Sequence, residues 1–284
     1  MSDLGPVSPG HRADAEWQRR WRLRPDGDPR TTASSALLPV TTRQGEPAML
    51  KLSRVAEEQR GGVLLEALDG HGVARVLRRK GRAILIERAT GMGDLVAMVA
   101  AGRDDEATRI VCETGALLHA ASADVLALDD PPELVDLPTW FRQLFERADR
   151  LDPFHRRGAD LAWTLLEAPR DEVVLHGDLH HGNVLDFGER GWLAIDPKAL
   201  YGERAFDFAN LLCNPSHERA LRPGRLARQL DVVVATTGID RGRMLDWLVA
   251  WCALSSTWFA IDGDPGHARS AVAIGELALA LRAG

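Results

Sequence analysis

Cysteine is scarce in this sequence. Its three cysteines, Cys112, Cys213 and Cys252, lie far apart in apolar segments. They form no CxxC pair and no disulfide framework, so we expect buried thiols in a reducing cytoplasm. No apolar stretch follows the N-terminus either, so we expect no signal peptide.

Long apolar runs are also missing. Residues 245–261 are rich in apolar side chains, but they include Asp246, Ser255, Ser256 and Thr257. This segment is too short and too polar to span a bilayer comfortably, so we expect a core helix and no membrane association.

Positive charge is not in excess. The 284 residues include 41 Asp and Glu against 35 Lys and Arg, and the formal net charge is −6. This balance does not favour nucleic acid as a partner, and it suits a small cationic substrate. The 45% apolar and 27% charged residues are ordinary for a soluble globular protein, and the length allows two lobes.

The order of secondary-structure signals predicts those two lobes. Residues 1–15 are rich in Pro, Gly and Ser, and we expect them to be disordered. Strand signals then dominate to residue 88, at 36–40, 48–52, 73–77 and 83–86, with one helix at 55–68. Helices dominate afterwards, at 110–119, 137–151, 159–167, 205–213, 224–236, 241–261 and 267–282. We therefore predict an α+β fold with a small β-rich N-terminal lobe at 1–88 and a larger, mainly helical lobe at 89–284.

A short hairpin carries the most information about function. Residues 184–187 and 192–195 are typical strands, and Gly188-Glu-Arg-Gly191 is a turn between them. The hairpin brings its outer neighbours Asn183 and Asp196 together, and both supply the hard oxygen ligands that Mg²⁺ prefers. Asp178 lies five residues before Asn183. An acid, an Asn five residues on and an Asp across a hairpin are the catalytic layout of protein-kinase-like phosphotransferases.

Two other interpretations of this segment remain. His176, His180 and His181 are a possible metal cluster, although the glycines beside them disfavour the helix that would align them. An ordinary polar turn before a hairpin would also contain Asp and Asn, but the ordered set is hard to obtain by chance.

The N-terminal lobe supplies candidates for binding a nucleotide. Lys51 lies in an apolar run and needs a carboxylate partner, for which we prefer Glu58 to Glu57. Ser34 and Ser35 would cover a triphosphate, although no GxGxxG motif is present and a plain polar turn is the alternative. At the join between the lobes, the backbone of Glu87 and Ala89 would bind an adenine edge, unless this segment is only a linker.

The motif His176-Gly-Asp-Leu-His-His-Gly-Asn183, followed by Ala194-Ile-Asp-Pro197, resembles the aminoglycoside phosphotransferase family. The fuller pattern is similar to the streptomycin 6-kinase subgroup, which is also linked to hydroxyurea resistance. Further marks of this subgroup are Gly202-Glu203-Arg204, Phe206-Asp207, Ala209-Asn210 and 233–238, and the likeness runs from about Trp21 to the C-terminus.

This resemblance implies a two-lobed protein-kinase-like fold and an antibiotic-resistance kinase that acts as a cytoplasmic monomer. ATP would be the donor, and the 6-hydroxyl of the streptidine ring of streptomycin the acceptor. Asp178 would be the catalytic acid group, Asn183 and Asp196 the Mg²⁺ ligands, and Lys51 with Glu58 the phosphate-binding pair. Lys198 replaces the Phe-Gly typical of protein kinases, and no Ala-Pro-Glu motif follows. A small-molecule acceptor is therefore favoured over a protein.

The two guanidinium groups of streptidine call for carboxylates and aromatic rings. By their place in the sequence the candidates are Glu203, Asp207, Asp262, Asp264 and Trp258. Each acid has the alternative of a solvated surface charge, and Asp207 has that of holding the catalytic loop. Two other functions also remain: a kinase of another aminocyclitol, amino alcohol or sugar, and a nucleotide-binding module with little turnover.

Overall fold

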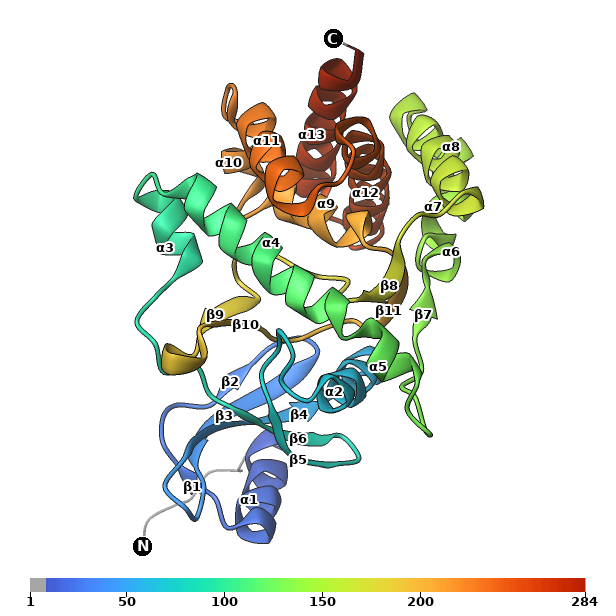
Figure 1. The fold of residues 1–284 in the computed structure, drawn as a ribbon. Helices are drawn as coiled ribbons and strands as arrows, with labels where there is room; N and C mark the ends of the chain where they lie inside the picture. Colours follow the sequence, from blue (N-terminus) through green and yellow to red (C-terminus); the bar gives the residue numbers. More distant parts are fainter. Residues whose placement is uncertain (1–8, 284) are drawn as a thin grey trace, which may run out of the picture.

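The computed structural model describes residues 9–283, which form two lobes joined by residues 88–94 (Figure 1). The N-terminal lobe contains most of the strands, and the C-terminal lobe is mainly helical. The predicted α+β, two-lobed fold is therefore confirmed.

One antiparallel sheet forms most of the small lobe. Its strand order is β1-β3-β4-β6-β5, and β2 pairs with the free part of β3. The strands are β1 (Arg24–Pro25), β2 (Arg30–Thr31), β3 (Ser35–Thr41), β4 (Pro47–Ser53), β5 (Val76–Lys80) and β6 (Ala83–Glu87). The four main predicted strands are all present. The third begins at Val76 because Val73 pairs instead with Ala194 of the large lobe.

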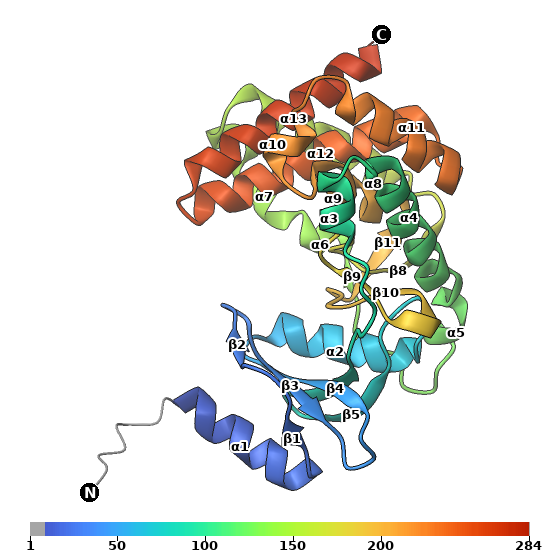
Figure 2. The ribbon, with the colours of Figure 1, turned by 90° about the vertical axis from the view of Figure 1, so that its left-hand side faces the viewer.

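The two helices of this lobe lie on opposite sides of the sheet: α1 (Pro9–Trp21) and α2 (Ala56–Leu68) (Figure 2). On the α1 side, Trp21 packs with Leu38, Val40 and Leu50 in a separate apolar cluster. The α2 side is continuous with the core of the large lobe. Helix α1 begins at Pro9, which differs from the expected disorder through residue 15; residues 1–8 lie outside the described range.

The large lobe contains eleven helices and five short strands among the described residues. The helices are α3 (Leu95–Ala100), α4 (Asp104–Ala120), α5 (Ser122–Leu126), α6 (Leu137–Trp140), α7 (Arg142–Arg147), α8 (Pro153–Glu167), α9 (Ala205–Cys213), α10 (His217–Ala220), α11 (Arg225–Thr237), α12 (Arg241–Ile261) and α13 (Pro265–Ala283). The strands are β7 (Val135–Asp136), β8 (Glu172–Leu175), β9 (Val184–Asp186), β10 (Trp192–Ala194) and β11 (Leu200–Glu203). Antiparallel β9 and β10 are the predicted hairpin, whereas β7, β8 and β11 form a small sheet that we did not predict.

Three predicted helices differ in their boundaries, and the one expected at 110–119 begins earlier, at Asp104. The expected helix at 137–151 is divided into α6, α7 and a 3₁₀ turn. Helix α8 begins at Pro153 rather than 159, because the Asp152 side chain accepts hydrogen bonds from the first free N–H groups. Asp followed by Pro is a common helix start, so the sequence contained this signal.

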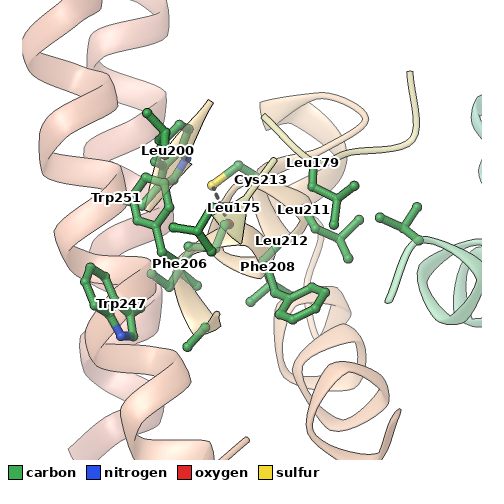
Figure 3. Close-up of a cluster of buried hydrophobic side chains, with 14 of the residues drawn as sticks. Leu175, Leu179, Leu200, Phe206, Phe208, Leu211, Leu212, Cys213, Trp247 and Trp251 are labelled. Atoms are coloured by element: carbon green, nitrogen blue, oxygen red, sulfur yellow. Dashed lines mark hydrogen bonds between the residues drawn. The ribbon is translucent and has the colours of Figure 1, made fainter. Parts of the chain in front are cut away.

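Helix α12 has the length and apolar composition of a membrane-spanning helix, but 67% of its most apolar stretch is buried inside the protein. Figure 3 shows Trp247 and Trp251 pointing from α12 toward Phe206 of α9. Their ring centroids lie 5.7 and 5.5 Å from that of Phe206. These contacts agree with the core helix expected from the sequence.

The segments between the lobes are bonded to the β9–β10 hairpin. The N–H groups of Gly91 and Gly93 donate to the carbonyl and the carboxylate of Asp186, each at 2.9 Å. A Cβ atom on Gly91 would lie 2.0 Å from Asp186 Cγ, so only glycine fits there. The Ala74 N–H donates to the Ala194 carbonyl, and the Ala194 N–H donates to the Gly72 carbonyl, each at 2.9 Å. Because β6 ends at Glu87, we propose that the boundary between the lobes lies between residues 88 and 89.

We predict that Gly158→Ala destabilises the protein. Its Cβ would lie 2.3 Å from Ala253 Cβ, so α8 and α12 must move apart. Overpacking of this kind costs about 1–3 kcal/mol in free energy of unfolding, despite the helix propensity of alanine. Urea unfolding measures the change.

Gly266→Ala is the matched control, because a Cβ there meets only Asp264 Oδ1 at 3.4 Å. Its free energy of unfolding should stay within about 0.5 kcal/mol of wild type. Equal stability of the two variants would contradict the tight packing of α8 against α12.

Candidate active site

The loop that carries Asp178 follows β8 and is tied to the hairpin by His176. The buried His176 ring donates its Nε2–H to the Ile195 carbonyl at 2.8 Å, and its Nδ1 accepts from the Asp178 N–H at 3.2 Å. Burial lowers the pKa of His176, which favours the neutral ring that this pattern requires. The loop and the end of β10 are thus held together.

Asp207 of α9 also fixes the loop that carries Asp178. Its buried carboxylate accepts the N–H groups of His176 at 2.8 Å and Gly177 at 2.7 Å, and Nε2 of His119 at 2.8 Å. All of these contacts are internal, so the predicted substrate role of Asp207 is wrong. The alternative that it holds the catalytic loop is the one that its contacts support.

The other predicted substrate acids do not line the cavity beside Asp178 that is described below. Glu203 is buried against Arg243 and accepts the Arg170 N–H at 3.0 Å, so its predicted role is wrong. Asp262 is exposed at the end of α12, and Asp264 pairs with His267. Neither Asp262 nor Asp264 lines a described cavity, although His267, the partner of Asp264, lines the one beside Asp178.

Two amide groups fix the carboxylate of Asp178. Asn183 Nδ2 donates to Oδ2 at 3.1 Å and also to the Asp178 carbonyl at 2.9 Å. Asn210 Nδ2 donates to Oδ1 at 2.9 Å. We assigned no role to Asn210, although its i, i+3 spacing from Asp207 places both on one face of α9. The carboxylate plane is therefore set before any substrate binds.

Asn183 and Asp196 flank the hairpin as predicted, and the Ile195 N–H donates to the Asn183 carbonyl at 2.9 Å. Asp196 Oδ1 accepts from Lys51 Nζ at 2.8 Å. Within residues 9–283, Asp196 Oδ2 and Asn183 Oδ1 accept no hydrogen bond, and no cluster of three or more His, Cys, Asp or Glu forms a metal site. A carboxylate oxygen and an amide oxygen that are free of hydrogen bonds are ligands of the kind that Mg²⁺ prefers. A magnesium site therefore fits these residues better than a site for a metal bound by histidine.

The ion pair between Lys51 and Glu58 is confirmed, and Lys51 is only 6% exposed. The Glu58 carboxylate also accepts from Ser34 at 3.2 Å and Ser35 at 3.4 Å. Burial raises the pKa of Glu58, but the hydrogen bond and charge of Lys51 outweigh it and leave that pKa below its usual range. The two hydroxyls thus orient the ion pair, in place of the triphosphate cover that we expected.

A cavity of about 460 Å³ lies between the sheet and the hairpin. Lys51 and Asp196 line one end of it, and Glu87 and Ala89 line it at the lobe junction. The Ala89 backbone makes no hydrogen bond to the described part of the chain, whereas the Glu87 side chain is bonded to Arg190. The other walls of this cavity are mostly apolar: Leu37, Pro39, Met49, Ile86, Leu185, Phe187 and Ile195. This shape suits a flat aromatic base whose phosphates lie toward Lys51.

A second cavity, of about 580 Å³, is lined by Asp178. Trp258 lines it as predicted, with its ring centroid 5.5 Å from Trp140 and 5.7 Å from Trp251. Glu57 and Asp178 are the carboxylates that line it in the described part of the chain. We did not predict Trp140 or Glu57, because their neighbours are distant in sequence. The aromatic faces and the carboxylate of Asp178 suit a cationic acceptor, whereas Glu57 is paired with Lys198 in the same cavity.

The chain matches one family along most of its length. The family described as "Aminoglycoside/hydroxyurea antibiotic resistance kinase" matches residues 20–263. Streptomycin 3''-kinase of Klebsiella pneumoniae is 48% identical over 93% of this chain and 98% of its own length. Streptomycin 6-kinase of Streptomyces griseus is 32% identical over 90% of this chain and 85% of its own length.

Solved structures show the same fold at lower identity. An amicoumacin kinase solved with AMP-PNP and Ca²⁺ has a TM-score of 0.65 and 16% identity, and the match covers 95% of this chain and 96% of that one.

A buried histidine next to this site predicts a pH dependence of stability. His181 is 2% exposed, and neither ring nitrogen has a hydrogen-bond partner among the described residues. Burial, followed by the charge of Arg225, lowers its pKa to about 4. Unfolded histidine has a pKa of about 6.5, so only the unfolded chain takes up a proton between these values. The stabilisation is complete above about pH 6.5 and is lost as the pH falls to about 4.

His181→Leu removes this proton uptake. Between pH 7 and 4.5, wild type should lose about 2 kcal/mol more free energy of unfolding than the variant. Urea unfolding at both pH values, without metal or nucleotide, measures the difference. Equal losses would show that His181 is protonated in the folded protein.

Proposed function

This chain belongs to the aminoglycoside/hydroxyurea antibiotic resistance kinase family, and from that premise we propose that it transfers the γ-phosphoryl group of ATP to a hydroxyl of streptomycin. The observation that carries the proposal is the position of Asp178 and Asp196. Asp178 lines one cavity and Asp196 the other, and the catalytic loop and hairpin connect them. A donor and an acceptor can therefore meet beside Asp178.

The residues of this chain have distinct tasks in the proposed reaction. Asp178, fixed by Asn183 and Asn210, accepts a hydrogen bond from the acceptor hydroxyl and aims its oxygen in line with the γ-phosphorus. Lys51, held by Glu58, binds the α and β phosphates. Asn183 and Asp196 would hold Mg²⁺, which supplies charge neutralisation on the phosphate oxygens. The backbone of Ala89 and the carbonyl of Glu87 would bind the adenine edge, because the Glu87 N–H already donates to the Arg75 carbonyl. ATP as the donor implies a cytoplasmic reaction.

The acceptor hydroxyl is the finer part of the proposal. The sequence motif implied the 6-hydroxyl, which agrees with the 32% identity to a streptomycin 6-kinase. The 48% identity to a streptomycin 3''-kinase favours the 3''-hydroxyl. We therefore propose the 3''-hydroxyl as the main acceptor, with the 6-hydroxyl as the second candidate.

The first experiment tests transfer itself. The protein, Mg-ATP and streptomycin should yield singly phosphorylated streptomycin, detected by mass spectrometry. Asp178→Asn should lower kcat by about two decades or more, because the group that orients and deprotonates the hydroxyl is weakened. Asp262→Asn is the control, since Asp262 is an exposed aspartate outside both cavities. No phosphorylated product from the folded protein would refute the proposal for streptomycin.

A panel of other aminocyclitols, amino alcohols and sugars in an ATP-consumption assay then separates a kinase with another acceptor from a module that only binds nucleotide.

The second experiment locates the phosphate. Fragmentation of the product separates the streptidine ring, which carries the 6-hydroxyl, from the rest of the molecule. We expect the added mass on the fragment without streptidine. Phosphate on streptidine would instead support the 6-hydroxyl, and the 3'' assignment would be wrong.

A further inference from the structure

Lysine is used sparingly in this chain. Among the 35 Lys and Arg residues, only Lys51, Lys80 and Lys198 are lysines. Lys80 is exposed at the end of β5, whereas Lys51 and Lys198 both contact the carboxylate of Glu58. A lysine ammonium is a compact charge on a flexible stem, which suits a group that changes partners. The meeting of two lysines on one carboxylate suggests a shared task.

The two lysines face different cavities. Lys198 Nζ lies 3.1 Å from Glu57 Oε1 and 3.2 Å from Glu58 Oε1. Lys198 lines the cavity of about 580 Å³ that Asp178 also lines, which we call the acceptor-side cavity. Lys51 lines the cavity of about 460 Å³, which we call the nucleotide-side cavity. Lys51 is paired with the other oxygen of Glu58. Glu58 thus lies between the two cavities with an ammonium on each side.

The backbone of Lys198 is fixed although its side chain is long. Asp196 and Ala199 have φ values of 59° and 56°, a region that non-glycine residues rarely adopt. The Lys198 N–H donates to the His176 carbonyl at 2.6 Å. A Cβ on Gly61 would lie 2.0 Å from the Pro197 carbonyl oxygen, so α2 packs directly on this turn. Any change of partner by Lys198 must therefore come from its side chain.

The positive charge of Lys198 does not suit a cationic acceptor. Among the described residues that line the acceptor-side cavity, Lys198 is the single Lys or Arg. In a cavity for a cationic acceptor, a permanent positive charge opposes binding. The anion that reaches this position in the proposed reaction is the terminal phosphate of ATP.

We propose that Lys198 is a catalytic residue that moves from Glu57 and Glu58 to the terminal phosphoryl group of bound ATP and stays on that group as it passes from donor to acceptor. This inference rests on the proposed phosphotransferase function. The acceptor oxygen forms a bond to the γ-phosphorus, and the bond from that phosphorus to the bridging oxygen breaks. The electron pair leaves with ADP, and the hydroxyl proton goes to Asp178. Lys198 keeps its protons and donates hydrogen bonds to the non-bridging oxygens, whose charge it offsets.

The kinetic test compares Lys198→Met with Lys80→Met. Lys198→Met should lower kcat by about 100-fold or more, because a hydrogen-bond donor to the reacting oxygens is lost. The Kd for ADP should change by less than about threefold, because ADP lacks the transferring group, and the KM for the cationic acceptor should not rise, because the variant removes a positive charge from its cavity. Lys80→Met should behave as wild type. A Lys198→Met protein with kcat within about threefold of wild type would refute the proposal.

A second test uses the wild-type protein and no acceptor. Acylation with an amine-specific reagent is followed by peptide mass spectrometry, in which each of the three lysines lies in its own segment of the sequence. AMP-PNP with Mg²⁺ should slow the acylation of Lys198, whereas ADP with Mg²⁺ should not. Lys51 should be protected by both nucleotides and Lys80 by neither.

Equal acylation of Lys198 with AMP-PNP and with ADP would refute the contact to the terminal phosphate. Because this experiment needs no acceptor, a failure of streptomycin as substrate leaves its result intact. Conversely, active transfer to streptomycin with unchanged Lys198 reactivity would refute this inference alone.

Discussion

The buried carboxylate of Asp207 is the interaction on which the rest of the site depends. It receives two backbone N–H groups of the catalytic loop and the ring of His119, so it joins α4, α9 and the segment after β8. Asn210, one turn further along α9, then fixes Asp178. Removing one partner of a buried charged group costs about 3–5 kcal/mol, so this contact is costly to alter. The position of Asp178 is therefore a property of the helical core as much as of its own loop.

The second organising contact is the carboxylate of Glu58, which connects the lobes by charge. It holds Lys51 of the sheet and Lys198 of the turn after the hairpin, and two serine hydroxyls fix its orientation. Asp178 and Asp196 are both acidic, so a phosphate placed near them meets repulsion unless cations accompany it. Lys51 and Lys198 supply such positive charge from the protein itself. This fits a chain that belongs to a kinase family.

The sequence predicted what is local along the chain and missed what depends on distant partners. The β9–β10 hairpin, the flanking Asn183 and Asp196, and the pairing of Lys51 with Glu58 follow from strand periodicity, turn residues and the cost of burying an unpaired ammonium. Glu203 failed as a substrate residue because its partner Arg243 lies 40 positions away. Trp140 was missed because it reaches the acceptor-side cavity from α6, far in sequence from Asp178. Composition alone does not reveal which acids are neutralised internally.

The connections between the lobes have a mechanical consequence. Gly91 and Gly93 are bonded to Asp186 of β9, Ala74 to Ala194 of β10, and Arg190 of the hairpin turn to Glu87 and Gly70 of the small lobe. Attachments at several separate places resist sliding and twisting of the hairpin against the small lobe. The oxygen atoms of Asp196, at the end of the hairpin and paired with Lys51 of the sheet, are therefore held in a fixed relation to the small lobe.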